Sequence, residues 1–161
     1  EHHHRCVKEG RTPLSIDSIR DNYELTQIVV NSPKTAAIYV AGGVPKNYIN
    51  DSIVMSYIFD KERGHSYAIQ VTTAYPLDGG LSGSTLGEAQ SWGKIKKDAN
   101  TAMAFVEPSI SVPLLAAYVA GKGLGKSRQR LNFDWDGEIL KGITRGRTSA
   151  AAANGNGARR R

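Results

Sequence analysis

Three side chains near the middle of the chain have types and a spacing that suit amine chemistry. Glu88 and Trp92 stand four residues apart, so a helix would place the carboxylate and the indole ring on one face. Such a pair can bind a cationic amine through a charge-assisted hydrogen bond and a cation–π contact. A capping glutamate beside a core tryptophan would show the same spacing. The two residues alone leave both interpretations open.

The third side chain is Lys94, which follows a glycine that can end the helix and let the lysine leave the helical face. Only the neutral amine of a lysine can attack a carbon electrophile. An ordinary lysine is almost wholly protonated at neutral pH, so a nucleophile at this position would need apolar surroundings. Lys96 and Lys97 lie close by, and the three lysines together are also typical of a solvated basic patch.

Gly42 and Gly43 follow a short apolar run and precede Pro45, which suits the first turn of a helix. Glycines remove Cβ atoms where a backbone must approach a phosphate, and a helix N-terminus offers free N–H groups there. The pair lacks the full Gly-x-Gly-x-x-Gly spacing of dinucleotide-binding turns. An ordinary tight turn remains an equally good interpretation.

These residues lie within alternating helix and strand patterns. Apolar runs predict strands at 36–41, 67–73 and 101–106, and 3.6-residue periodicity, caps and prolines predict helices at 18–31, 45–60, 85–92 and 110–120. This alternation predicts an α/β fold whose parallel sheet has helices on both faces. Ligands of such sheets bind beyond the carboxyl ends of the strands. The three strands are few for this architecture, so the chain is expected to be a portion of a larger fold.

Length and charge suggest one domain and argue against nucleic acid as a specific partner. The 161 residues carry a net charge of +6, but residues 1–121 hold 11 basic and 12 acidic side chains, whereas residues 122–161 hold 10 and 3. The excess therefore belongs to the end of the chain, where a basic tail can touch nucleic acid only non-specifically. We expect a flexible segment at 1–13, an α/β domain at 14–121 and a basic, largely disordered tail at 122–161.

Other partners and compartments can be narrowed from the same composition. No apolar run approaches the roughly 18 residues that span a bilayer, and the N-terminal residues do not resemble a secretory signal. A cytoplasmic protein without a membrane partner is the expectation. Cys6 is the only cysteine, which excludes a disulfide within the chain, and the run His2–His4 could bind a metal only weakly.

Five stretches of the sequence resemble one family. They are Ala41-Gly-Gly-Val-Pro-Lys-Asn-Tyr-Ile49, Tyr67-Ala-Ile-Gln-Val-Thr-Thr-Ala74, Asp78-Gly-Gly-Leu-Ser-Gly83, Glu88-Ala-Gln-Ser-Trp-Gly-Lys-Ile95 and Pro113-Leu-Leu115. Together they resemble the C-terminal half of deoxyhypusine synthase, particularly its bacterial and archaeal deoxyhypusine synthase-like relatives. The resemblance covers residues 16–120, and its most specific part is Ser91-Trp-Gly-Lys94.

The resemblance implies a Rossmann-like, NAD-binding fold and an aminobutyl transferase. In this family NAD takes a hydride from spermidine, and a lysine that matches Lys94 holds the butylamine group as an imine. An acceptor amine then displaces that lysine. By the same resemblance Asn47, Glu88 and Trp92 occupy amine-binding positions. The positions that match the cofactor site are Gly42, Gly43, Thr73, Ala74, Asp78, Gly79, Ser82 and Glu107.

Two positions depart from the eukaryotic pattern of the family. Asn47 replaces a histidine of the amine pocket, and Leu81 replaces an acidic residue that would hold one ammonium group. A smaller diamine such as putrescine, with homospermidine as the product, is therefore an alternative to spermidine and a protein lysine. The resemblance also implies a tetramer with active sites between subunits. Because the family's N-terminal half is not in this sequence, a non-catalytic partner subunit or an inactive fragment is a further alternative.

Overall fold

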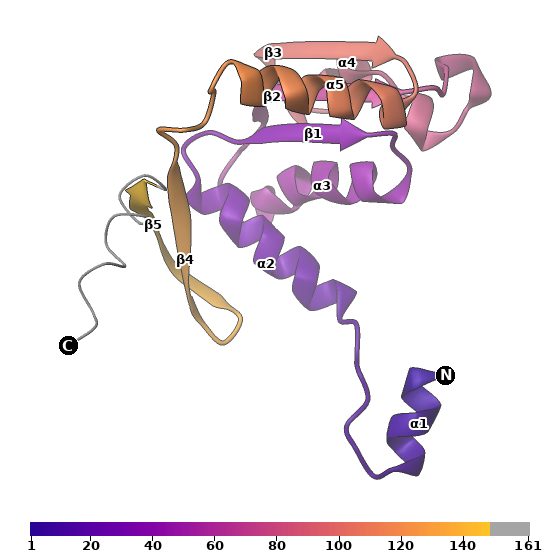
Figure 1. Ribbon diagram of the computed structural model, residues 1–161. Helices are drawn as coiled ribbons and strands as arrows, with labels where there is room; N and C mark the ends of the chain where they lie inside the picture. The colour runs from indigo at the N-terminus through magenta and orange to yellow at the C-terminus, as the bar shows by residue number, and fades with distance from the viewer. Residues whose placement is uncertain (149–161) are drawn as a thin grey trace, which may run out of the picture.

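The computed structural model describes residues 1–148, and its centre is a three-stranded parallel sheet (Figure 1). The strands are β1 (Ala36–Val40), β2 (His65–Thr72) and β3 (Ile95–Phe105), in the order β1-β2-β3. Both pairings are parallel, with Ile38 opposite Ile69 and Ile69 opposite Ala102. The predicted α/β fold with three adjacent parallel strands is therefore confirmed. The Rossmann-like cofactor-binding type remains an expectation.

The helices begin and end where the sequence supplies caps. Asp17 caps α2 (Ser18–Asn31) by accepting a bond from the Arg20 N–H at 3.0 Å, and Pro45 occupies the first turn of α3 (Val44–Met55). Thr85 caps α4 (Leu86–Ser91) through the Glu88 N–H at 3.0 Å. A 3₁₀ turn, η1 (Ser56–Phe59), continues α3, so the α-helix ends earlier than predicted.

The core lies on one face of the sheet. Ala37, Tyr39 and Ala68 are buried there, together with Leu86 and Ala89 of α4. The opposite face carries apolar side chains that stay accessible: Ile38 is 65% and Val40 54% exposed. The last helix, α5 (Pro108–Gly121), also has no buried residue. It begins two residues before the predicted start, which places Pro113 inside the helix.

Both terminal segments contain structure that the sequence did not predict. Residues 2–8, expected to be flexible, form the short helix α1 (His2–Lys8), which stands apart from the sheet (Figure 1). Within the tail, β4 (Gln129–Asp136) and β5 (Ile139–Thr148) form an antiparallel hairpin. The expectation of a largely disordered tail therefore fails at 129–148, because alternating residues there pair as strands. The remainder of the predicted tail, 149–161, lies outside the described residues.

The hairpin packs against α2 through one buried side chain. Gln27 is 4% exposed, and its Nε2 donates to the Glu138 carbonyl at 2.7 Å while its Oε1 accepts from the Leu140 N–H at 2.9 Å. Leu140 is itself buried at this contact. Among residues 1–148, no helix is long and apolar enough to cross a membrane.

Candidate active site

A small hollow brings together the residues predicted for amine chemistry. Its volume is about 220 Å³, and its lining comes from α3, the loop before α4, α4 itself and the turn into β3. The lining residues are Asn47, Asn50, Leu81, Ser84, Glu88, Ala89, Trp92 and Lys94. All four residues assigned to catalysis or amine binding from the sequence, namely Lys94, Asn47, Glu88 and Trp92, therefore share one hollow.

The backbone of Lys94 is fixed between α4 and the sheet. Gly93 adopts a left-handed conformation with φ 72°, which turns the chain out of α4. The Lys94 N–H then donates to the Ala89 carbonyl at 3.0 Å, and the Lys94 carbonyl accepts from the His65 N–H at 3.1 Å. The next residue, Ile95, starts β3 and is fully buried.

The amine of Lys94 belongs to a closed polar triangle on α3. Its Nζ lies 3.2 Å from Asp51 Oδ1 and donates to Asn47 Oδ1 at 3.3 Å. Asn47 Nδ2 in turn donates to Asp51 Oδ2 at 3.0 Å. The Lys94 side chain is 18% exposed, which leaves the amine reachable from the hollow. Sequence reasoning missed Asp51, although its position four residues after Asn47 puts both on one face of α3.

Glu88 and Trp92 face the same space from α4. Within residues 1–148 the Glu88 carboxylate makes no ion pair and no side-chain hydrogen bond, whereas its N–H is used by the Thr85 cap. Trp92 is 72% exposed, so its indole ring offers an open π-face. Lys96 and Lys97 are exposed on β3 and do not line the hollow. The structure thus separates Lys94 from the two neighbouring lysines.

A second hollow of about 240 Å³ adjoins the first and contains one residue predicted for cofactor binding. It is lined by Pro76, Gly79, Gly80, Leu81, Ser84 and Glu88, and the last three residues also line the hollow of Lys94. A Cβ atom placed on Gly79 or Gly80 would meet nothing within 4 Å. The space beside these glycines is therefore open to a ligand.

The other residues predicted at the cofactor lie near the strand ends but line neither hollow: Gly42, Gly43, Thr73, Ala74, Asp78, Ser82 and Glu107. Several of them have partners inside the protein. Asp78 Oδ2 accepts from the Tyr75 N–H at 2.9 Å, and Glu107 Oε1 accepts from the Ser109 N–H as the cap of α5 at 3.2 Å. Their cofactor role remains a prediction.

Gly42 is needed for packing of the protein against itself. A Cβ atom on Gly42 would lie 2.6 Å from the Cα of Ser82, closer than real Cβ contacts come. Gly43, with φ 82°, adopts the left-handed backbone that glycine allows, and it caps α3. The first glycine therefore lets the β1–α3 turn contact the loop before α4, and the second turns the chain into the helix.

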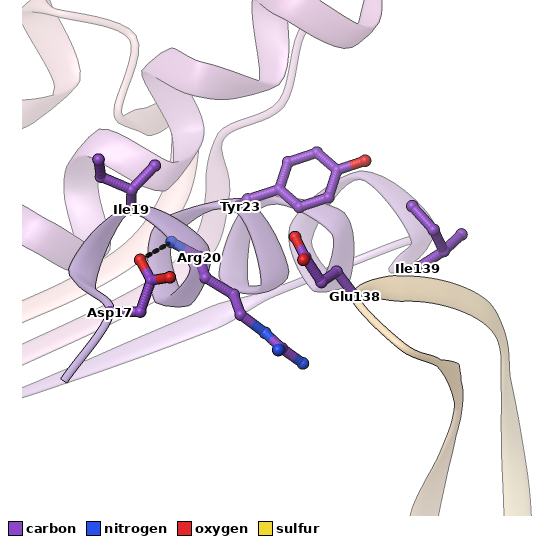
Figure 2. A pocket seen from close by; sticks show the side chains of 6 residues that line it. All are labelled: Asp17, Ile19, Arg20, Tyr23, Glu138 and Ile139. Atoms are coloured by element: carbon purple, nitrogen blue, oxygen red, sulfur yellow. Dashed lines mark hydrogen bonds between the residues drawn. The ribbon is translucent and has the colours of Figure 1, made fainter. Parts of the chain in front are cut away.

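A larger hollow of about 760 Å³ lies elsewhere, between α2 and the hairpin (Figure 2). Its lining consists of Asp17, Ile19, Arg20, Tyr23, Glu138 and Ile139, none of which was predicted to act in chemistry. Arg20 already pairs with Glu24 at 2.7 Å, and the Glu24 carboxylate raises the pKa of that guanidinium. Size alone does not make this hollow the reaction site. Within residues 1–148, no three His, Cys, Asp or Glu residues gather as a metal site.

Comparisons with known proteins match the chain to one family. A model described as deoxyhypusine synthase matches residues 2–119. A probable deoxyhypusine synthase 2 of Methanosarcina mazei is 45% identical over 125 residues, which cover 77% of this chain and 36% of the relative. A protein of the same name from Archaeoglobus fulgidus is 50% identical over 113 residues, covering 70% and 38%. A deoxyhypusine synthase-like protein of Elusimicrobium minutum is 43% identical over 121 residues, covering 74% and 32%.

Fold and site together define an α/β protein that gathers a lysine, a carboxylate and an indole ring beside a parallel sheet. With a family model matching most of its length, the chain belongs to the deoxyhypusine synthase family. The resemblance seen in the sequence is thereby confirmed, and the match extends it back to residue 2, across α1. The chain spans about a third of the length of the curated relatives it matches.

Proposed function

We propose that this chain carries the amine-binding and imine-forming part of an NAD-dependent aminobutyl transferase. The observation that supports the proposal is the hollow in which Lys94 meets Asn47, Glu88 and Trp92. A lysine that is mostly shielded, beside a free carboxylate and an open aromatic face, is the arrangement expected for covalent capture of a cationic amine. The activity proposed is that of full-length members of the family, about a third of whose length this chain covers.

Each side chain has a distinct task in this proposal. Glu88 and Trp92 bind the ammonium end of the substrate, and Asp51 with Asn47 holds the Lys94 amine toward the hollow. The Lys94 ammonium group first passes a proton to Asp51 Oδ1, 3.2 Å away, and the neutral amine then attacks the imine carbon of the oxidised polyamine. A C–N bond to Lys94 forms, the bond to the original amine breaks, and that amine leaves with the proton Lys94 has released. An acceptor amine then displaces Lys94 in the same manner.

The cofactor of the family would accept and return one hydride, which supplies the oxidation and reduction that the amine chemistry requires. The residues present fit such a group in part. Gly79 and Gly80 leave open space beside the hollow of Lys94, and the α3 N-terminus after Gly43 offers free N–H groups and a positive dipole end. Gly42 already packs against Ser82, so in this proposal the cofactor contacts the residues next to Gly42 rather than Gly42 itself.

The number of unpaired carboxylates at the hollow limits which polyamines are suitable substrates. Asp51 is already paired with Lys94, which leaves Glu88 as the unpaired carboxylate lining the hollow within residues 1–148. Leu81 also lines the hollow, and by the family resemblance it replaces an acidic residue that would hold one ammonium group. One end of the substrate is therefore recognised by charge, and the rest meets neutral side chains, both polar and apolar. This pattern suits putrescine as donor or acceptor as well as spermidine, with a diamine or a protein lysine as the acceptor.

An oligomer is also part of the proposal, because apolar surface stays accessible on this chain. On α5, Ile110 is 59%, Leu114 66% and Tyr118 60% exposed, and the sheet face with Ile38 and Val40 is open. Surfaces of this kind are covered in folded proteins by further structure or by another subunit. The tetramer implied by the family resemblance is one arrangement that would cover them.

The test is covalent trapping on a complete protein. This chain would be joined to the part of the Methanosarcina mazei relative that its match does not cover, and incubated with NAD and spermidine or putrescine. Borohydride then reduces any imine, and peptide mass spectrometry locates the adduct. We expect a butylamine adduct on Lys94. Lys94→Arg should show none, because arginine keeps the charge but cannot form the imine.

Lys96→Arg is the matched control, since that lysine is exposed and lies outside the hollow. It should leave the adduct on Lys94 unchanged. An adduct on Lys96 or Lys97 instead, or transfer that survives Lys94→Arg, would overturn the mechanism. If the joined protein forms no adduct on any lysine, the chain is better interpreted as a non-catalytic partner subunit than as part of an enzyme.

A further inference from the structure

A buried lysine lies behind the hollow of Lys94 and has no part in the chemistry proposed above. Lys46, on α3, is 4% exposed. Its Nζ donates to the Ser84 carbonyl at 2.5 Å, to Ser84 Oγ at 2.8 Å and to Gln70 Oε1 at 3.0 Å. The Leu81 carbonyl lies at 3.4 Å. Burial lowers the pKa of this lysine, and the charge of Glu88 acts in the opposite direction.

Gln70 acts on the same loop from the central strand. It is 1% exposed, and its Nε2 donates to the Ala41 carbonyl at 2.8 Å and to the Ser82 carbonyl at 3.0 Å. The backbone carbonyls of three loop residues, Leu81, Ser82 and Ser84, thus accept bonds from two buried side chains. The close approach allowed by Gly42 places Ser82 directly against the β1–α3 turn.

The loop held in this way forms the common wall of the two hollows. Leu81 and Ser84 line both the hollow of Lys94 and the adjoining hollow beside Gly79. Any movement of residues 81–84 would therefore change the shape of both spaces at once. If Lys46 only filled space, an apolar residue could do the same without the cost of removing a charge from water. The directed bonds of Lys46 indicate a different purpose.

We propose that Lys46 is a positioning residue whose buried ammonium group, together with Gln70, clamps residues 81–84 and so sets the wall that faces Lys94. The clamp itself is a property of this chain. Only the identity of the ligand that the wall shapes, a polyamine, rests on the proposed function. The experiment therefore measures the loop first and the ligand second.

Hydrogen exchange on the 161-residue chain tests the clamp without any substrate. Lys46→Met keeps a long side chain and removes the ammonium group, and Lys97→Met makes the same change at an exposed site. In Lys46→Met we expect the amides of residues 81–84 to exchange at least about 10-fold faster, while those of β1 and β2 stay within about twofold. Lys97→Met should change neither. Unchanged exchange at 81–84, or equal acceleration across β1 and β2, would overturn the proposal.

Chemical rescue distinguishes the ammonium group from the bulk of the side chain. In a Cys6→Ser background, Lys46→Cys is alkylated in the unfolded state with 2-bromoethylamine, which restores an amine on a side chain of lysine length. Iodoacetamide gives the matched neutral product. We expect protection of 81–84 to return only with the amine. If the neutral product restores it equally, the charge has no role. Ser84→Ala, which removes the 2.8 Å bond, should give a smaller loss of protection in a chain that still folds.

The ligand arm uses the borohydride assay on the joined protein. Lys46→Met should lower the trapped adduct on Lys94 at limiting spermidine and recover most of it at saturating spermidine, because a displaced wall weakens binding more than chemistry. Equal loss at both concentrations would assign Lys46 to the chemical step and overturn the positioning role. If the unsubstituted protein traps nothing, the transferase proposal fails while the exchange result still decides the clamp.

Discussion

The Nζ of Lys94 lies 3.2 Å from Oδ1 of Asp51, and Asn47 bridges the same two residues from the preceding turn of α3. This contact links the end of α4 to α3 across the hollow. Because Asp51 is 42% exposed, the ion pair is solvated on one side. Its expected contribution to folding is small, about 1 kcal/mol or less. We expect the main effect of the ion pair to be the orientation of the Lys94 amine.

Asp51→Asn separates these two contributions, because it keeps the shape of the side chain and removes the charge. We expect the free energy of unfolding to change by no more than about 1 kcal/mol. Trapping of the butylamine group on Lys94 should fall by about 10- to 100-fold, since a small misplacement of a reacting group is enough for such a loss. Urea unfolding and the borohydride assay provide the two measurements. Asp98→Asn, at an exposed site on β3, should alter neither.

Gly42→Ala should destabilise the fold and Gly80→Ala should not. The new Cβ at position 42 would lie 2.6 Å from the Cα of Ser82, so the loop or the β1–α3 turn must move. We expect a loss of about 1–3 kcal/mol in the free energy of unfolding. At Gly80, φ is −86° and nothing lies within 4 Å of the added atom. Equal stability of the two variants in urea would contradict the close approach.

Tyr39→Phe tests a buried hydrogen bond between the sheet and α3. The Tyr39 hydroxyl donates to Asn50 Oδ1 at 2.6 Å, and burial raises the pKa of that phenol to about 12, so it remains a donor at every ordinary pH. Removal of the hydroxyl leaves the Asn50 acceptor unpaired, and we expect a loss of about 1–2 kcal/mol. Tyr67→Phe, at a half-exposed site on the open face, is the control. Thermal unfolding of both variants measures the difference.

His65 should make the fold less stable in mild acid. Burial lowers its pKa below 6.5, and a backbone contact at Ile49 opposes this effect more weakly. Below about pH 6.5 the unfolded chain binds a proton at His65 more readily than the folded chain does. The free energy of unfolding therefore decreases as the pH is lowered, until the pH reaches the pKa of His65 in the folded chain. Above about pH 6.5, His65 adds no pH dependence.

His65→Gln removes this titrating group while keeping a polar side chain that can reach Thr35, whose Oγ1 lies 2.8 Å from the His65 Nδ1. The stability difference between pH 7.5 and pH 5.5, measured by urea unfolding, should become smaller in the variant. A pH dependence that stays the same would show that His65 charges as easily inside the fold as outside it.

Gln27→Leu should release the hairpin from α2. The substitution removes the donor to the Glu138 carbonyl and the acceptor for the Leu140 N–H together. Exchange of the Leu140 amide should rise by about 10-fold or more, while the amides of β1 and β2 keep their protection. Gln27→Glu retains the acceptor and loses the donor, so it should show an intermediate effect. Protection of Leu140 that survives Gln27→Leu would place the anchor elsewhere.

The order of elements between residues 18 and 120 could be predicted from the sequence because most of them carry a local signal. Pro45 and Thr85 mark helix starts, a 3.6-residue period marks the helix at 18–31, and the apolar runs mark the strands. The spacing of Glu88 and Trp92, together with the family resemblance at Lys94, likewise pointed to residues that share one hollow. These features depend on residues that are close together in the sequence, so the sequence pattern is enough to predict them.

The parts that were missed depend on contacts between distant residues. β3 begins at Ile95, well before the predicted start, because its first residues lie on an outer strand of the sheet where charged side chains can reach solvent. In the sequence Lys46 resembles any lysine on a helix, because its contacts with Gln70 and the loop at 81–84 form only in the folded chain. The hairpin owes its position to Gln27, more than 100 residues earlier.

In the proposed reaction, the main-chain bonds of Lys94 to Ala89 and His65 would also limit the conformational entropy that the residue must lose. A nucleophile on a free loop would lose backbone freedom, roughly 1–2 kcal/mol per residue, each time a substrate fixed it in place. At Lys94 that loss has already occurred during folding. What remains to be ordered is the motion of a four-carbon side chain, worth up to about 2 kcal/mol, and the contacts to Asp51 and Asn47 have removed part of it in advance.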